Sequence, residues 1–194
     1  MILYLNSSDA LRELSGFYIT TLVLVCTELK SLRNDSLSGL STIKYLTIHG
    51  TSISSIQERA FHSMTSLIKL IIYYDFDEKD SKHPFIGMGN LKTLVIHSRE
   101  YRANTEFDSV RTRTKCPNEE VFVGLSNLTN LHLEKTGFTC LKPGSFLVLH
   151  QIEEIVMFGN NIGETTHGVF GAECIKKIDI SCKNVTLSKY CKQH

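Results

Sequence analysis

Apolar residues return along this chain at a fixed interval. The steps of the clearest ladder are equal, apart from one longer step between Phe85 and Phe122, and its members are Leu37, Phe61, Phe85, Phe122, Phe146 and Phe170. A fixed period of about 24 residues means that each unit cannot bury its own apolar face and must stack on its neighbours. The pattern therefore predicts a solenoid, and the function of a solenoid is to be sought on its surface.

Two further ladders run in phase with the first and define an L-x-L core in each unit. Its first positions are Leu22, Leu46, Leu70, Leu94, Leu131 and Ile155, and its second positions are Leu24, Ile48, Ile72, Ile96, Leu133 and Met157. Alternation of buried and outward residues is typical of a short strand with one buried face. We therefore expect one strand per unit, with a fourth ladder (Ile19, Ile43, Leu67, Leu91, Leu128 and Ile152) filling the interior.

The full unit reads L-x-x-L-x-L-x-x-T-x-L-x-x-L-x-x-x-x-F-x-x-L, best preserved in residues 43–67 and 128–152. This resembles the 24-residue leucine-rich repeat of extracellular receptors and matrix proteins, Toll-like receptor ectodomains above all, over residues 19 to about 187. The resemblance implies an α/β solenoid: a horseshoe segment with a parallel concave β-sheet and an irregular or short-helical convex side. We expect a single domain over residues 1–194 with about seven repeats, an insertion near 99–116 and a cysteine-containing end at 174–194.

The chain departs from this family in the column that usually holds asparagine. The column reads Thr27, Thr51, Asp75, Arg99, Thr136, Asn160 and Lys183. Threonine can still donate and accept a hydrogen bond, so we expect the turn to persist in most repeats. The third repeat has Asp77 and Asp80 in place of apolar residues, so its segment is expected to bulge outward. The same acidic cluster lacks the ordered spacing of a calcium loop.

Composition favours a soluble module. The chain has 194 residues, 42% of them hydrophobic, with a formal net charge of +1. That is enough apolar material for one core, and the charge gives no specific signal for nucleic acid or an anionic membrane as the main partner. The apolar run from Leu22 to Cys26 is too short to span a bilayer, and no secretory leader is visible. We expect a piece of a longer ectodomain, or a chain lacking its leader.

Two of the six cysteines, Cys116 and Cys140, occupy the same column of adjacent repeats, because they precede Leu131 and Ile155 by the same number of positions. Neighbouring strands lie about 4.8 Å apart, within the usual range of disulfide Cα separations. We therefore predict a Cys116–Cys140 bridge that fastens the insertion to the scaffold. The alternative is reduced thiols, as in a cytosolic repeat protein. No pairing is assigned to Cys26, Cys174, Cys182 or Cys191.

Four N-glycosylation sequons occur, at Asn6, Asn34, Asn127 and Asn184. Asn6 and Asn34 are the better candidates for modification, because Asn34 lies on the outer part of its repeat and Asn127 precedes the packed Leu128.

No motif indicates catalysis, a metal or a cofactor. The eight histidines are scattered, and neither a phosphate loop nor a C-x-x-C pair occurs in the sequence. The chain therefore lacks the usual signatures of a nucleophile or a zinc site. We expect a protein that is not an enzyme.

The outward residues of the concave sheet form the first candidate ligand site. Register brings together Tyr45, His49, Tyr73, Tyr74 and His97, with Ile71 and Val95 beside them. Exposed aromatic residues with few charges are typical of interface cores, although aromatic residues also simply suit strands. Because histidines titrate near pH 6.5, an anionic ligand could bind better as the pH falls. The second candidate site is the insertion near 99–116, since long loops often carry function.

These features predict a non-enzymatic extracellular ligand-recognition module, which the resemblance places in a Toll-like pattern-recognition receptor. The alternative is a secreted or cell-surface adhesion or matrix protein that uses the same face. A protein or microbial ligand on the concave face or the insertion is expected in either case, and the receptor family also implies possible dimerisation.

Overall fold

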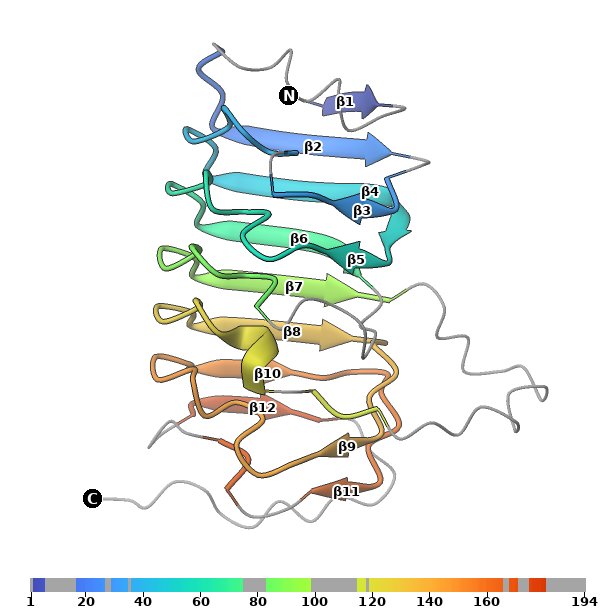
Figure 1. Ribbon diagram of the computed structural model, residues 1–194. Coiled ribbons are helices and arrows are strands. Elements are labelled where there is room, and N and C mark those ends of the chain that lie inside the picture. The colour runs from blue at the N-terminus through green and yellow to red at the C-terminus, as the bar shows by residue number, and fades with distance from the viewer. Residues whose placement is uncertain are drawn as a thin grey trace, which may run out of the picture.

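One strand from each repeat joins a parallel sheet that runs along the molecule (Figure 1). The computed structural model describes residues 2–5, 17–26, 29–34, 36–74, 83–98, 115–117, 119–165, 168–170 and 175–180. The strands of this main sheet, in spatial order, are β1 (Ile2–Leu5), β2 (Thr21–Cys26), β4 (Tyr45–Ile53), β6 (Lys69–Tyr74), β7 (Thr93–His97), β8 (Asn130–Glu134), β10 (Glu154–Val156) and β12 (Lys177–Asp179). Spatial order follows chain order throughout, as stacking of sequential repeats requires.

The strand register is the one that the leucine ladders predict. The first positions of the L-x-L core pair strand by strand in the order Leu22, Leu46, Leu70, Leu94, Leu131 and Ile155. These residues and the second positions of the core, from Leu24 to Met157, are almost completely buried. Strands β7 and β8 pair directly, Leu94 with Leu131, although the insertion separates them in the chain. The insertion therefore leaves the main sheet uninterrupted.

The two ends of the sheet differ from the regular repeat. At the C-terminal end, Ile155 pairs with Ile178, across a step shorter than the one from Leu131 to Ile155. At the N-terminal end, β1 pairs with β2 through Leu3 and Leu24, and this step is shorter still. The sequence pattern placed the start of the repeats at residue 19 and did not predict β1. The short step breaks the period there, even though Leu3 and Leu5 form an L-x-L pair.

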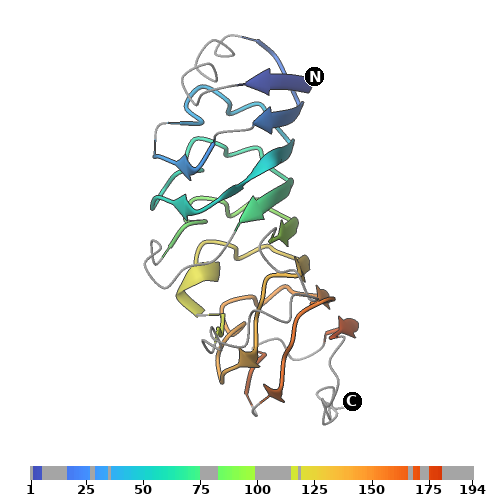
Figure 2. The ribbon, with the colours of Figure 1, turned by 90° about the vertical axis from the view of Figure 1, so that its right-hand side faces the viewer.

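The phenylalanine ladder forms a spine behind the sheet, in the returning segments that Figure 2 shows on the side opposite the main strands. Ring centroids lie 6.1 Å apart between Phe61 and Phe85, 5.5 Å between Phe122 and Phe146, and 5.6 Å between Phe146 and Phe170. All five rings pack in the core, but Phe170 is only partly buried. The spine prediction is therefore confirmed, with incomplete burial at its C-terminal end.

The returning segments contain little regular structure. Short strands pair parallel between neighbouring repeats: β3 (Ser31–Leu32) with β5 (Ser55–Ile56), and β9 (Cys140–Leu141) with β11 (Glu164–Thr165). The helical element in the described part of the chain is a 3-10 turn, η3 (Glu119–Phe122). The irregular convex side is confirmed, and the solenoid is nearly all β rather than α/β in content.

Asparagine and threonine maintain the predicted polar column between the last complete repeats. The Asn160 amide nitrogen donates to the carbonyl oxygens of Leu133 and Met157 at 2.6 and 2.9 Å. Its amide oxygen accepts from the Thr136 hydroxyl at 2.9 Å and from the Phe138 backbone N–H at 3.2 Å. Both side chains are buried, so Thr136 takes part in the polar column through its hydrogen bond to the Asn160 side chain. The column members Thr27, Asp75, Arg99 and Lys183, and the acidic residues Asp77 and Asp80, lie outside the described residues.

Candidate functional site

Three ring side chains from adjacent strands form a continuous row on the outer face of the main sheet, the face predicted to be concave. His49 comes from β4, Tyr73 from β6 and His97 from β7, and we call them the ring column. Ring centroids lie 5.5 Å apart between His49 and Tyr73 and 5.3 Å apart between Tyr73 and His97. Parallel strands place equivalent residues about 4.8 Å apart, so register alone stacks these rings. All three are partly exposed.

Residues at equivalent strand positions lie at both ends of the ring column. Val25 pairs with His49 at one end, and Glu134 pairs with His97 at the other. Beside the column, Ile71 is partly buried and Val95 is 9% exposed, so together they form an apolar floor. The repeat columns of the sequence predicted this grouping, and the structure brings the residues together.

Two tyrosines predicted for this surface behave differently. Tyr45, at the start of β4, is 45% exposed and lies on the outer face, as expected. Tyr74 is 0% exposed, so the prediction that it faces solvent is wrong. Strand β6 alternates strictly through its last residue, so Tyr74 points inward with Leu70 and Ile72. A register shift in β4 places Tyr74 opposite Ile53 instead of Gly50.

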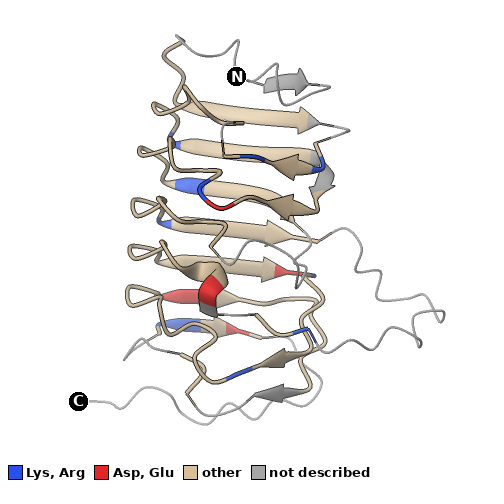
Figure 3. Cartoon of the chain, in the orientation of Figure 1, with Lys and Arg blue, Asp and Glu red and all other residues tan. Residues whose placement is uncertain are grey.

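Charged side chains cluster on the neighbouring strands β8, β10 and β12 of the main sheet (Figure 3). The Lys177 ammonium contacts one Glu154 carboxylate oxygen at 2.5 Å, and the Asn130 amide donates to the other at 2.9 Å. The His132 Nε2 atom lies 3.8 Å from Glu154. The Lys177 and Asn130 hydrogen bonds hold the pKa of Glu154 below its usual value. The sequence pattern did not single out these four residues, and the structure shows that they form one network.

His97 contacts both the rings and this charged region. Its Nδ1 atom lies 3.6 Å from a Glu134 carboxylate oxygen. Burial lowers the pKa of His97 below 6.5, and this outweighs the raising effect of Glu134; His49, His132 and Lys135 lower it further. His97 is therefore uncharged at neutral pH.

A depressed histidine pKa predicts acid sensitivity of the fold. As the pH falls below 6.5, the unfolded chain takes up the His97 proton before the folded chain does. Stability is therefore fully present above pH 6.5 and decreases until the pH passes the folded-state pKa. In urea unfolding at pH 7.5 and pH 5.0, His97→Gln should lose less stability on acidification than the unmodified chain. An equal loss in both proteins would contradict this assignment.

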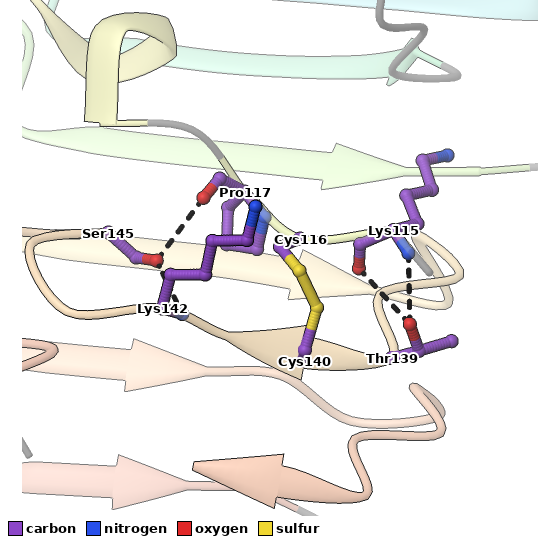
Figure 4. The surroundings of a disulfide bond; sticks show 7 residues. All are labelled: Lys115, Cys116, Pro117, Thr139, Cys140, Lys142 and Ser145. Carbon is purple, nitrogen blue, oxygen red and sulfur yellow. Dashed lines mark hydrogen bonds between the residues drawn. A yellow bond between two sulfur atoms is a disulfide. The ribbon is translucent and has the colours of Figure 1, made fainter. Parts of the chain in front are cut away.

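The predicted disulfide is present in the structure. Cys116 and Cys140 are bonded, with their Cα atoms 5.0 Å apart (Figure 4). Around the bond, the Thr139 N–H donates to the Lys115 carbonyl oxygen at 2.9 Å, and the Lys115 N–H donates to the Thr139 hydroxyl oxygen at 2.9 Å. The Ser145 hydroxyl donates to the Pro117 carbonyl oxygen at 3.2 Å. Residues 115–117 are thus fastened to the next repeat, whereas residues 99–114 of the insertion lie outside the described part.

Chemical mapping checks this bond. Peptide mapping without reductant should recover Cys116 and Cys140 in one linked peptide pair, because register alone brings their Cα atoms within bonding distance. Recovery of either residue as an alkylatable thiol would contradict the assignment. The side chain of Cys26 and the positions of Cys174, Cys182 and Cys191 are outside the described structure, so their pairing stays unassigned.

The sequons differ in their surroundings. Asn34 lies in an exposed turn, and the nearby Ser36 hydroxyl accepts from the Arg33 N–H at 3.0 Å. The Asn127 amide nitrogen donates to the Gly89 carbonyl oxygen at 2.7 Å, so this side chain is already held in a hydrogen bond to the preceding repeat. Asn34 therefore remains a predicted glycosylation site, whereas Asn6 and Asn184 are outside the described residues.

Other site classes receive no support from the described part of the chain. None of its helices is long and apolar enough to cross a membrane. Within the same residues, no group of three or more histidine, cysteine, aspartate or glutamate side chains could hold a metal ion.

Comparisons with known proteins agree with this architecture. Residues 18–74 match the family "Leucine rich repeat", and residues 104–194 match "BspA type Leucine rich repeat region (6 copies)". Toll-like receptor 3 of Bos taurus is 25% identical over 82% of the chain, and that of Boselaphus tragocamelus is 24% identical over 77%. The chain spans about a fifth of the length of these receptors, 20% and 19% respectively.

Solved structures share the fold. The structure of the TLR13–ssRNA13 complex matches with a TM-score of 0.59 and 15% identity, over 95% of this chain and 29% of that one. The structure of human 5T4, a trophoblast glycoprotein also named Wnt-activated inhibitory factor 1, matches with a TM-score of 0.54 and 17% identity, over 80% of this chain and 61% of that one.

Proposed function

Since the chain is a leucine-rich-repeat protein that resembles part of a Toll-like receptor ectodomain, we propose that it is a ligand-recognition module. It acts outside the cell, without catalysis, as one domain of a pattern-recognition receptor. The ligand, a protein or a microbial molecule, binds the outer face of the main sheet.

The ring column carries this proposal. Three adjacent strands present His49, Tyr73 and His97 at intervals of about 5.5 Å or less, with Tyr45 45% exposed beside them. Aromatic residues over an apolar floor are enriched in the cores of protein interfaces. Regular hydrogen bonding along the parallel sheet holds these side chains on a rigid support, which lowers the entropic cost of binding.

A nucleic acid is the less favoured ligand. The TLR13 structure was solved with ssRNA13, but this chain has a net charge of only +1. Binding to phosphate backbones depends on clustered lysine and arginine, whereas the ring column has a carboxylate, Glu134, at one end.

An adhesion or matrix protein is the second candidate function. The likeness to 5T4, a glycoprotein by name, shows that the fold also occurs outside the Toll-like receptors. This alternative uses the same outer face for a protein partner. The sequence beyond the repeats of the full-length protein separates the two functions, since a receptor requires a membrane span and a signalling domain.

Binding measurements with a single substitution test the proposal. We suggest probing the immobilised chain with an array of secreted and cell-surface ectodomains and with ssRNA13, at pH 7.5 and pH 5.5. For any partner found, Tyr73→Ala should weaken binding at least about tenfold, equivalent to about 1.4 kcal/mol, because its ring lies in the centre of the column.

Leu147→Ala is the matched control. Leu147 is 49% exposed but lies in a returning segment, away from the outer face, so its loss should leave binding unchanged. If Tyr73→Ala binds as the unmodified chain does at both pH values, the outer face is not the ligand site. The insertion near 99–116 then becomes the leading candidate.

A further inference from the structure

The Glu134 carboxylate lies at one end of the ring column. It has no lysine or arginine partner among the described residues. Glu134 is in register with His97, and its side chain is 33% exposed. The distance of 3.6 Å between the His97 Nδ1 atom and the carboxylate is too long for a hydrogen bond. Within the described structure, Glu134 forms no ion pair with a lysine or an arginine.

The neighbouring carboxylates behave differently. Glu153 contacts the Lys176 ammonium at 2.8 Å, and Glu154 contacts the Lys177 ammonium at 2.5 Å. Lys135 follows Glu134 in sequence, but its side chain packs over the backbone of Gly159. The two are so close that a Cβ atom added to Gly159 would lie only 2.8 Å from the Lys135 Cγ atom. Ion pairs with lysine therefore neutralise Glu153 and Glu154, whereas the described residues provide no such pair for Glu134.

At neutral pH the histidine beside Glu134 does not neutralise it either. Burial keeps the pKa of His97 below its ordinary value, so the imidazole is uncharged. A partly exposed carboxylate next to uncharged rings attracts a cation, and a guanidinium group can satisfy both carboxylate oxygens at once.

From this arrangement we propose that Glu134, His97 and Tyr73 form a subsite for a cationic side chain, an arginine or lysine of a protein ligand, which binds at neutral pH and is released on acidification. This inference rests on the proposed function of the outer face and specifies the chemistry of its ligand.

Protonation of His97 sets the sign of the pH dependence of the subsite. As the pH falls from 7.5 toward 5.5, the His97 imidazole takes up a proton and gains positive charge; the other titratable side chains around it are His49, Tyr73, His132 and Lys135. Lys177 is already cationic, because its hydrogen bond to Glu154 raises its pKa, and Glu154 stays ionised because its hydrogen bonds lower its pKa. Protonated His97 also pairs with Glu134 and competes with the incoming cation. A cationic ligand must therefore bind more weakly in acid.

A small-molecule titration of the whole chain tests the subsite directly. The probes are N-acetyl-arginine amide and N-acetyl-citrulline amide, which have similar shapes but differ in charge. In NMR spectra, the arginine probe should shift the ring resonances of Tyr73 and His97 at pH 7.5, and citrulline should not. The arginine affinity should fall by about fivefold at pH 5.5, since an exposed ion pair contributes little more than that.

Matched glutamine variants complete the test. Glu134→Gln should abolish the arginine-induced shifts, while Glu153→Gln, which alters an exposed carboxylate already paired with lysine, should retain them. Equal responses to arginine and citrulline, or unchanged shifts in Glu134→Gln, would overturn the inference.

An anionic probe, N-acetyl-aspartate amide, separates this inference from the proposed function. If it shifts the ring column at pH 5.5 while the arginine probe does not at pH 7.5, the outer face still binds ligand but the cation subsite is wrong. If Tyr73→Ala leaves the binding of an identified partner unchanged, the proposed function fails, whatever the arginine probe does.

Discussion

Replacing Phe146 with alanine should lower the free energy of unfolding by about 3 to 5 kcal/mol. The Phe146 ring is 0% exposed, and its centroid lies 5.5 Å from that of Phe122 and 5.6 Å from that of Phe170. Its removal leaves a cavity between two neighbouring repeats, and a stacked solenoid depends on such contacts between repeats. Urea unfolding followed by circular dichroism measures the change.

The adjacent residue supplies the control. Leu147 is 49% exposed, so Leu147→Ala should change stability by no more than about 0.5 kcal/mol. Repeat arrays can unfold in parts, so coincident transitions by two probes must first establish cooperativity. A loss below about 1 kcal/mol for Phe146→Ala would show that the spine assignment is wrong.

Replacing Tyr74 with alanine should have a similarly large effect on stability, about 3 to 5 kcal/mol. Tyr74 is among the largest fully buried side chains of the protein, and it ends the inward-facing series of Leu70 and Ile72 in β6. Thermal or urea denaturation of the purified variant measures the loss.

Tyr73→Ala is the contrast, since the two tyrosines are neighbours on opposite faces of one strand. Tyr73 packs against His49 and His97 without complete burial, so its loss should cost at most about 1.5 kcal/mol. Comparable destabilisation by both substitutions would mean that β6 does not present the ring column outward. The pair thus separates a residue of the core from a residue of the binding surface.

Sequence periodicity was sufficient to predict the solenoid, its register and its spine, because strand pairing between repeats leaves little freedom once the period is known. The same register placed His49, Tyr73 and His97 in one column, and it brought Cys116 and Cys140 within bonding distance. Each of these predictions needed only the sequence spacing and the separation of neighbouring strands.

Irregular steps limited the prediction. Strand β1 was missed because the step from Leu3 to Leu24 is shorter than the regular step from Leu22 to Leu46. Tyr74 was placed on the wrong face because the register shift in β4 cannot be read from a column alignment; strict alternation along β6 was the signal that could have found it. The uncharged state of His97 depends on burial and on four neighbouring groups, which a sequence cannot quantify.

Histidine footprinting is the most direct test of the claim that the outer face binds ligand. Diethyl pyrocarbonate modifies accessible neutral imidazoles, and the chain provides internal controls. His49 and His97 lie in the ring column, whereas His62 and His150 are exposed in returning segments. Mass spectrometry at pH 7.5 should show that an identified partner protects His49 and His97 and leaves His62 and His150 reactive. Protection of His62 or His150, with His49 and His97 still modified, would contradict the account.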